Sequence, residues 1–290
     1  MKVSVLSPAK INLSLDIIGK RPDGYHDVSM VMQSVSLYDT VTVEDIGVGN
    51  EVKISCTKSG VPLDKSNIAY KAYDAFFKYT EAEPHSVSID IEKNIPFGAG
   101  LAGGSTDGAG VILALNKLCS TRLSQKQMCE IASSFGADVP FCIMGGTAHA
   151  TNTGTDLKKI VSMPKCYIVI CKPEISISTK EAYDKCDSRP KKTFIYTDEV
   201  IRMLYKRDLR GLCSCLYNEF EEVLQLDEIV NLKKQMLKNK ALGCSMTGSG
   251  SAVYGIFDSE KKANACMNIL KENYNDVFVC KPTDVGCKIE

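Results

Sequence analysis

The chain has 290 residues, enough for one large domain or two of ordinary size with hydrophobic cores. Hydrophobic residues make up 44% and charged residues 24%, a composition that excludes a disordered or low-complexity protein. The 35 basic residues balance 35 acidic ones, so no net positive charge attracts nucleic acid or an anionic membrane. Any phosphate binding must therefore be local.

The 13 cysteines form no pattern typical of a disulfide framework or a metal site. Their number is odd, and no two stand in a Cys-x-x-Cys spacing. This usage predicts reduced thiols and a cytoplasmic location. Because Pro8 and Lys10 interrupt the N-terminal apolar segment, we expect no signal peptide. Since no run of about 18 apolar residues occurs, we expect no membrane span.

The first half of the chain predicts strands followed by helices. Between Val3 and Ile17, apolar residues mostly share one parity, which favours half-buried strands. Ser66 and Asn67 are good N-caps for a helix, and further helices are expected around 112–119 and 128–135. The other predicted strands of this half are Val28–Val43, Glu51–Cys56 and Ser86–Ile91.

A polar stretch over 151–159 predicts a domain boundary, and we expect one domain over 1–155 and a second over 156–290. The second half has the strand–helix–strand–strand–helix–strand order of a ferredoxin-like domain. Its predicted strands are Tyr167–Cys171, Cys244–Thr247, Ala252–Phe257 and Val277–Cys280. Its predicted helices are Asp198–Lys206, Leu216–Leu224, Ile229–Lys238 and a segment over 263–270.

The strongest local signal is a glycine-rich segment that leads directly into a predicted helix. Small residues let the backbone approach an anion closely, and amides at a helix N-terminus attract negative charge. The segment is neither a Walker loop nor a dinucleotide-binding loop. A phosphate-binding loop is favoured over the alternative, a glycine turn made for tight packing. Its residues are Pro96, Phe97, Gly98, Ala99, Gly100, Leu101, Ala102, Gly103, Gly104, Ser105 and Thr106.

Three polar residues in apolar surroundings are further candidates. Asp138 follows a predicted helix, where a carboxylate among small and apolar residues can accept a proton from a hydroxyl. The alternative, that Asp138 only caps the next turn before Pro140, stays open at this point. Lys10 and Asn12 share the polar side of the first strand, for which a solvated strand face is the ordinary explanation.

Two turns carry the remaining candidates. In the first, Tyr25 and His26 stand side by side, either as a recognition element or as a surface turn over a packed tyrosine. Gly248 and Ser249 lie in a glycine-rich hairpin that is either a plain turn or a segment closing over a nucleotide. With three histidines in the chain, we expect no histidine-based zinc site.

Together these segments resemble the GHMP kinase superfamily, which includes galactokinase and the homoserine, mevalonate and phosphomevalonate kinases. The similarity spans essentially the whole chain. The glycine loop marks only the superfamily, whereas the lysine strand with its Gly-Tyr-His turn is more selective. The resemblance implies a two-domain α+β GHMP kinase fold, with an N-terminal ribosomal-protein-S5-like domain and a C-terminal ferredoxin-like domain. The segments that carry it are Pro8–Leu13, Asp23–His26, Gly98–Asp107, Gly136–Pro140 and Gly248–Ser251.

The resemblance also implies roles for single residues. Asp138 corresponds to the catalytic base, and Lys10 to the lysine that keeps this base ionised and the reacting hydroxyl aligned. ATP, with substrate-bound Mg²⁺ and no metal held by the protein itself, is implied at the glycine-rich loop, with Asn67 and Lys93 near the adenine. The substrate-binding residues implied in the same way are Asn12, Tyr25, His26, Thr179, Tyr183, Gly248 and Ser249.

The selective motifs are most similar to those of kinases that phosphorylate the 2-hydroxyl of 4-diphosphocytidyl-2-C-methyl-D-erythritol in the non-mevalonate (methylerythritol phosphate) isoprenoid pathway. The alternatives are another GHMP kinase, acting on mevalonate, homoserine or a sugar, and a catalytically silent nucleotide-binding regulator. The implied partners are small molecules, not nucleic acid or a membrane, and we expect a monomer or homodimer. Thr106 stands where the superfamily usually has serine, and Gly108 where it has alanine.

Overall fold

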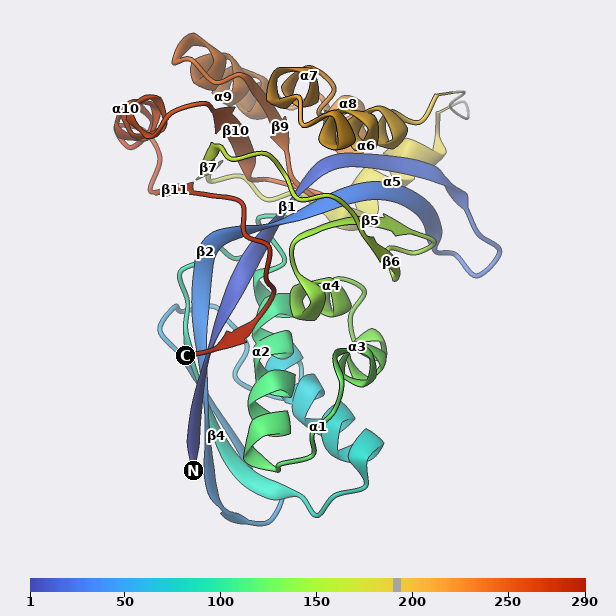
Figure 1. The fold of residues 1–290 in the computed structure, drawn as a ribbon, viewed down its shortest axis with the longest axis vertical. Coiled ribbons are helices and arrows are strands. Elements are labelled where there is room, and N and C mark those ends of the chain that lie inside the picture. Colours follow the sequence, from blue (N-terminus) through green and yellow to red (C-terminus); the bar gives the residue numbers. More distant parts are fainter. Residues whose placement is uncertain (190–193) are drawn as a thin grey trace.

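The computed structural model describes residues 1–189 and 194–290, which form two sheets with helices beside each of them (Figure 1). The first ten elements are β1 (Lys2–Lys20), β2 (His26–Val48), β3 (Val52–Cys56), α1 (Ile68–Thr80), β4 (His85–Glu92), α2 (Gly103–Leu118), α3 (Gln125–Ser133), α4 (Val139–Met144), β5 (Thr147–Thr151) and β6 (Asp156–Lys159). The remaining helices are α5 (Thr179–Asp187), α6 (Tyr196–Lys206), α7 (Leu209–Ser214), α8 (Glu219–Leu224), α9 (Asp227–Lys238) and α10 (Glu260–Leu270). The remaining strands are β7 (Tyr167–Lys172), β8 (Tyr217–Asn218), β9 (Gly243–Met246), β10 (Val253–Phe257), β11 (Asp276–Cys280) and β12 (Lys288–Ile289).

The first sheet is built on the long antiparallel hairpin of β1 and β2. Its order is β12-β1-β2-β4-β3, with β5 beside β2, β6 beside β5 and β8 beside β1. Strand β12 pairs with β1, so the end of the described chain returns to the sheet that opens it (Figure 1). Helices α1 and α2 lie against this sheet in the lower part of the view.

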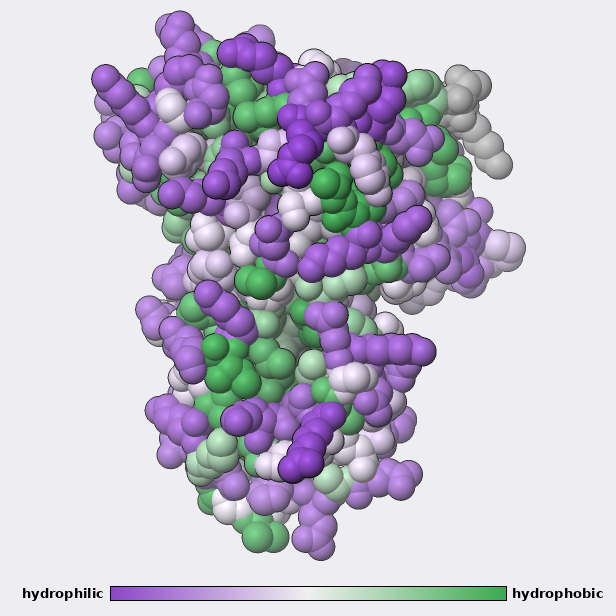
Figure 2. Space-filling model, viewed as in Figure 1, coloured by the Kyte–Doolittle hydropathy of each residue, from purple (hydrophilic) through white to green (hydrophobic). Residues whose placement is uncertain are grey.

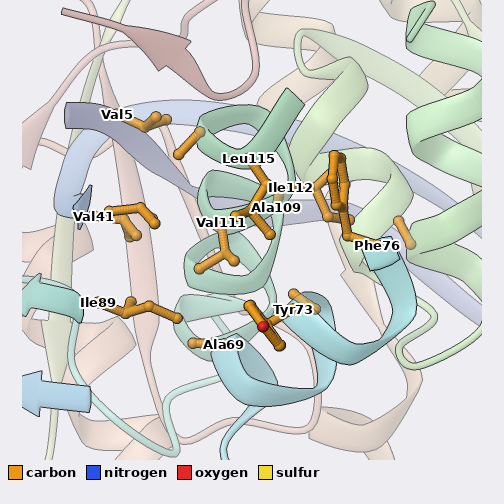
Figure 3. Packing of buried hydrophobic residues seen from close by; sticks show 14 of the residues in the cluster. Val5, Val41, Ala69, Tyr73, Phe76, Ile89, Ala109, Val111, Ile112 and Leu115 are labelled. Atoms are coloured by element: carbon orange, nitrogen blue, oxygen red, sulfur yellow. The ribbon is translucent and has the colours of Figure 1, made fainter. Parts of the chain in front are cut away.

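Apolar side chains of the first sheet and of α1 and α2 share one core. Figure 3 shows Val5, Val41 and Ile89 reaching from the strands toward α2, whose Val111 and Leu115 lie among them. Burial of such side chains stabilises the fold by about 1.5–3 kcal/mol for each of the larger ones. The N-terminus of α2 is thereby fixed relative to the sheet, which matters because the glycine-rich loop leads into it.

The β1–β2 ladder is irregular around the residues predicted to be functional. The register shifts between Pro8 and Ala9 and again between Asn12 and Ser14. Such bulges re-aim the side chains between them. The solvated strand face expected for Lys10 and Asn12 is wrong, because both residues are buried.

The second sheet confirms the ferredoxin-like prediction. It is antiparallel with the order β11-β7-β10-β9, so the first strand of the motif lies between its fourth and third strands. Val169 and Phe257 of one face pack against α9 and α10. Ile168 and Tyr254 of the other face belong to a core that also contains Ile11 of β1. The two sheets are therefore joined through a shared apolar interface.

Two segments differ from their prediction. The helix expected over Leu216–Leu224 begins only at Glu219, because Tyr217–Asn218 pairs with β1 as strand β8 and the Asn218 side chain accepts the amide of Glu221 as the helix N-cap. The polar stretch over 151–159 contains a hairpin turn and strand β6. The domain boundary expected at residue 155 falls at this turn, and the division into 1–155 and 156–290 stays a prediction.

Hydrophilic side chains cover most of the face shown in Figure 2. Apolar residues gather there only in small patches, as expected for a chain with 24% charged residues. Among the helices that the structure describes, none has both the length and the apolar character needed to cross a membrane.

Candidate active site

A cavity of about 600 Å³ lies where the two sheets meet. Its wall is formed by strand β1, the glycine-rich loop, the start of α4, the first turns of α5 and the turn between β9 and β10. All the loop residues from Pro96 to Ser105 contribute to it. The cavity therefore brings together segments that are far apart in the sequence.

The glycine-rich loop forms a cradle of backbone amides at the N-terminus of α2. Gly98, Gly100 and Ala102 all have positive φ angles. Residues of positive φ that alternate with residues of negative φ form the backbone nests in which proteins bind anions. Ala102 is the N-cap residue and supplies no side-chain hydrogen bond, so the first amides of α2 have no side-chain cap. A helix N-terminus in this state attracts an anion.

Gly100 is required where the loop meets the second domain. A Cβ atom at this position would collide with the backbone carbonyl of Thr247. The Thr247 hydroxyl donates to the Gly100 carbonyl over 3.2 Å, and the Ala252 amide donates to the Ala99 carbonyl over 3.1 Å. The cradle is thus fastened to the turn that follows β9.

The side chains of Lys10 and Asp138 meet at one end of this cradle. The Lys10 Nζ atom lies 3.9 Å from Asp138 Oδ2 and donates to Asn12 Oδ1 over 2.7 Å. The lysine side chain is 5% exposed, whereas that of Asp138 is 33% exposed toward the cavity. The two opposite charges therefore lie side by side at the cavity wall.

Asp138 occupies the N-cap position of α4 but makes no side-chain capping hydrogen bond. The alternative that it merely caps the next turn is therefore wrong. Its carboxylate lines the cavity beside Lys10, with Pro140 at the start of the short helix behind it. This carboxylate is available to accept a proton from a bound hydroxyl.

Asn12 connects Lys10 to the second domain. Its Oδ1 atom accepts hydrogen bonds from Lys10 Nζ and, over 3.0 Å, from the Gly248 amide. The backbone amide of Asn12 donates to the Thr247 hydroxyl over 3.1 Å. Asn12 therefore places the turn containing Gly248 and Ser249 directly beside Lys10. These four residues line the cavity, whereas Thr247 does not.

Helix α5 supplies the opposite part of the wall. Thr179 and Tyr183 line the cavity one helical turn apart, and the Thr179 and Ser249 hydroxyls lie 2.9 Å from each other. Burial raises the pKa of the Tyr183 phenol, with the Asp138 charge as a smaller cause. The Tyr183 ring stacks on that of His26 with centroids 4.3 Å apart.

Tyr25 and His26 lie beyond the edge of the cavity, at the end of the β1–β2 hairpin. Tyr25 is 67% exposed, so the alternative of a tyrosine packed beneath a surface turn is wrong. An aromatic ring exposed to this extent is free to stack on a planar ligand. Its role in substrate binding stays a prediction.

Three predicted ATP contacts are not on the cavity wall. Thr106 is buried near Cys287, and Asn67 caps α1 by accepting the Ala69 amide. Lys93 is buried below the loop, where its Nζ atom lies 2.5 Å from Asp39 and 2.6 Å from Asp107. Their contact with ATP stays a prediction.

Several cavity residues carried no signal in the sequence. Ile68, Met30, Thr153 and Phe220 line the wall as single residues of ordinary helices, strands and turns. Phe220 packs edge-on against Tyr183 with ring centroids 4.9 Å apart. Only the fold brings these positions to the cavity, and no local motif distinguishes them.

The donor set fits a magnesium ion that arrives bound to nucleotide. In the described part of the chain, Asp138 is the one carboxylate on the cavity wall. No group of three or more His, Cys, Asp or Glu side chains within residues 1–189 and 194–290 is placed to hold a metal ion. Mg²⁺ typically needs only one or two protein oxygens when phosphates supply the others.

The chain matches two protein families along its length. Residues 67–146 match the family described as GHMP kinases N terminal domain, and residues 201–276 match GHMP kinases C terminal. The 4-diphosphocytidyl-2-C-methyl-D-erythritol kinase of Clostridium tetani is 41% identical over 278 residues, covering 94% of this chain and 97% of that protein. The protein of the same name from Clostridioides difficile is 40% identical over 290 residues, covering 99% and 97%.

Solved structures of GHMP kinases are also similar to this chain. A crystal structure of 4-(cytidine 5'-diphospho)-2C-methyl-D-erythritol kinase superposes with a TM-score of 0.81 at 29% identity, covering 97% of this chain and 99% of the other. Homoserine kinase from Cytophaga hutchinsonii gives a TM-score of 0.81 at 20% identity, covering 100% and 97%. The second likeness shows the shared fold alone.

Proposed function

The chain belongs to the GHMP kinases and is similar over nearly its whole length to the 4-diphosphocytidyl-2-C-methyl-D-erythritol kinases among them. On this premise, we propose that it transfers the γ-phosphate of ATP to the 2-hydroxyl of 4-diphosphocytidyl-2-C-methyl-D-erythritol. The reaction belongs to the non-mevalonate route to isoprenoid precursors. The observation that carries the proposal is the meeting of Asp138 and Lys10 at one end of an amide cradle on a single cavity wall.

In the proposed reaction, Asp138 accepts the proton of the 2-hydroxyl as the oxygen attacks the γ-phosphorus. The new bond joins the substrate oxygen to the γ-phosphorus, the bond from that phosphorus to the β–γ bridging oxygen breaks, and ADP leaves. Phosphoryl transfer depends mainly on positioning and on charge stabilisation. A carboxylate half-open to the cavity and held beside an ammonium suits the task of a general base.

Lys10 has two tasks in this scheme. Its ammonium lies beside the Asp138 carboxylate as a counter-charge. One of its three N–H groups bonds Asn12, which leaves another to orient the acceptor oxygen. The buried stem of the side chain restricts its motion. Both features favour a fixed geometry at the reacting oxygen.

Residues 96–105 hold the triphosphate in the proposed complex, since all of them line the cavity and the last three form the N-terminus of α2. Mg²⁺ that enters with ATP would neutralise phosphate charge there, with Asp138 and the Ser105 hydroxyl as the available protein oxygens. Asn67, Lys93 and Thr106 remain predicted contacts on the ATP side.

The substrate lies, in this proposal, along α5 and the turn after β9. Asn12, Thr179 and Ser249 offer hydrogen-bonding groups near the hydroxyl that reacts. Tyr183 lies between these residues and His26, on which its ring stacks. The cytosine ring would then reach Tyr25 and His26 at the hairpin. We also propose a cytoplasmic location, which the 13 free cysteines support.

Acceptor specificity tests the proposal directly. Purified protein is incubated with Mg-ATP and each of four acceptors, 4-diphosphocytidyl-2-C-methyl-D-erythritol, mevalonate, homoserine and galactose, and a reaction without acceptor serves as the control. We expect ADP release to exceed the no-acceptor rate by orders of magnitude only with the cytidyl compound. Faster ADP release with mevalonate, homoserine or galactose would overturn the proposed substrate, and no release above background with any acceptor would overturn the kinase activity.

A further inference from the structure

A hydrogen-bonded group outside the cavity joins α5 to the end of the β1–β2 hairpin. The Asp187 carboxylate lies 2.7 Å from His26 Nε2 through one oxygen and 2.7 Å from Lys20 Nζ through the other. The His26 side chain is only 7% exposed and that of Asp187 is 25% exposed. The imidazole is therefore held in place although the hairpin end is a surface feature.

Helix α5 connects this group to the cavity. Thr179, Tyr183 and Asp187 are spaced by four residues, so they lie on one face of the helix. The first two line the cavity, and the third reaches the hairpin. Because the Tyr183 ring lies nearly parallel to that of His26, at 21°, the imidazole has a fixed plane as well as a fixed hydrogen bond.

The protons of this group can be assigned from its chemistry. Hydrogen bonds from Lys20 and then from His26 hold the pKa of Asp187 below its ordinary value, so the carboxylate is ionised and can only accept. The His26 Nε2 atom must then carry the hydrogen of this bond. In a neutral imidazole the other nitrogen, Nδ1, is consequently bare and acts as an acceptor.

The Nδ1 atom is available to a ligand. Within the described residues, no hydrogen bond involves His26 Nδ1, and the atom is not sealed from solvent. Cytosine presents an amino group at position 4 of its ring, whereas uracil presents a carbonyl oxygen there. An acceptor held by the protein can bond the amino group, and it repels the carbonyl oxygen.

We propose that Asp187 is a positioning residue that sets the base selectivity of the substrate site, by fixing His26 as the tautomer with a protonated Nε2 and an accepting Nδ1. This inference rests on the proposed function, because it assumes that the cytosine ring reaches the hairpin. Asp187 touches no substrate in this account and acts only through the imidazole.

The test compares two acceptors that differ only in the base, 4-diphosphocytidyl- and 4-diphosphouridyl-2-C-methyl-D-erythritol. The measured quantity is the ratio of their kcat/KM values in wild type, Asp187→Leu and Asp187→Asn. We expect Asp187→Leu to reduce the wild-type ratio by about tenfold or more, since one charge-assisted hydrogen bond no longer selects the tautomer. Asn can either accept from Nε2 or donate to it, so Asp187→Asn is expected to give an intermediate ratio.

Asp184→Asn is the matched control, because it removes one exposed carboxylate from the same helix. Its ratio is expected to equal that of the wild type. If Asp187 only stabilises the hairpin, both kcat/KM values fall together in Asp187→Leu and the ratio stays unchanged, which would overturn the inference. If the wild type phosphorylates neither acceptor, the proposed function itself fails, a result distinct from the first.

A spectroscopic measurement supplies a second, independent readout. The chain has three histidines, His26, His85 and His149, so ¹⁵N spectra of the imidazoles contain few signals and a His26→Gln variant assigns the one of interest. We expect the wild type to show a protonated Nε2 and an unprotonated Nδ1 at His26, and Asp187→Leu to show a mixture of tautomers. A protonated Nδ1 in the neutral wild-type imidazole would contradict the assignment.

Discussion

Two buried lysines of the first domain show how the same side chain serves two purposes. Lys93 lies between two buried carboxylates, at 2.5 Å from Asp39 and 2.6 Å from Asp107, away from the cavity wall. Lys10 lies 3.9 Å from one carboxylate, Asp138, and both of these residues line the cavity. Each lysine is 4% exposed, so burial alone does not distinguish them.

The difference lies in the number of ion-pair partners of each lysine and in their position relative to the cavity. Asp39 also accepts hydrogen bonds from the backbone amides of Asn94 and Ile95. These bonds fix the segment that leads into the glycine-rich loop. A Cβ atom at Gly103 would stand 3.0 Å from Lys93 Nζ, so this ion group lies directly beneath the start of α2. The Lys93 group therefore stabilises the segment that leads into the loop and the start of α2. Lys10 and Asp138, in contrast, face the cavity, where they can bond a ligand.

The largest expected effect concerns the open pair. In Asp138→Asn the proton acceptor is removed while the side chain keeps its shape, so kcat should fall by about 10²–10⁴-fold. Affinity for Mg-ATP, measured by calorimetry, and the unfolding free energy should change little, since Asp138 makes no capping hydrogen bond. A variant that retains more than half of the wild-type kcat would contradict the role of the carboxylate.

Replacing each lysine by methionine separates the two purposes. Lys93→Met leaves two buried carboxylates without a counter-charge, and the unfolding free energy should fall by about 3–5 kcal/mol. Lys10→Met should cost less than half of that, because Asp138 remains in contact with solvent, yet it should abolish phosphoryl transfer. Urea unfolding and steady-state kinetics on both variants test this crossed pattern, and equal losses of stability would break it.

Alanine substitutions at two glycines with positive φ, Gly98 and Gly100, test the contact between the glycine-rich loop and the second domain. Gly98→Ala meets no atom within 4 Å, so it should cost only the conformational penalty of about 1–2 kcal/mol. Gly100→Ala brings a Cβ into the Thr247 carbonyl in addition. We expect a larger loss of unfolding free energy and a clear fall in kcat/KM for Gly100→Ala. Indistinguishable variants would argue against a tight junction at Gly100.

Asp107 gives the Lys93 group a pH dependence. Burial raises the pKa of the Asp107 carboxyl well above its ordinary value of 3.8, so the folded chain binds this proton more tightly than the unfolded chain. The resulting stabilisation is complete below the ordinary value and is lost as pH rises through the higher folded pKa. Relative to wild type, the unfolding free energy of Asp107→Asn should therefore increase as pH rises above the ordinary carboxyl value of 3.8.

Urea titrations at several pH values measure this difference, with Asp39→Asn as the control. Asp39 accepts from Lys93 and from two backbone amides, so its replacement should destabilise the protein throughout the pH range. A difference between Asp107→Asn and wild type that stays constant with pH would contradict the assignment.

The sequence could predict the features that depend on local pattern. The glycine loop and the Asp138 segment carry their chemistry in adjacent residues, and the order of strands and helices after residue 160 was sufficient for the ferredoxin-like topology. Lys10 was harder. Its alternation with apolar neighbours is typical of a solvated strand face, whereas the structure buries it beside Asp138, a residue distant in the sequence.

Residues whose position depends on tertiary structure could not be predicted. Phe220 lies in a short helix whose start is fixed by the pairing of β8 with β1, a contact between distant segments. Asp187 is the last residue of α5, and nothing in its neighbourhood in the sequence indicates the hairpin that it bonds. Lys93 likewise gives no sign in the sequence that two carboxylates enclose it.

The most direct test of the central claim is a crystal structure of the protein with a non-hydrolysable ATP analogue and 4-diphosphocytidyl-2-C-methyl-D-erythritol. We expect the triphosphate along residues 98–105 and the 2-hydroxyl oxygen within hydrogen-bond distance, about 3 Å, of the Asp138 carboxylate and in line with the γ-phosphorus. A 2-hydroxyl bound far from Asp138, or a triphosphate outside the cradle, would contradict the account.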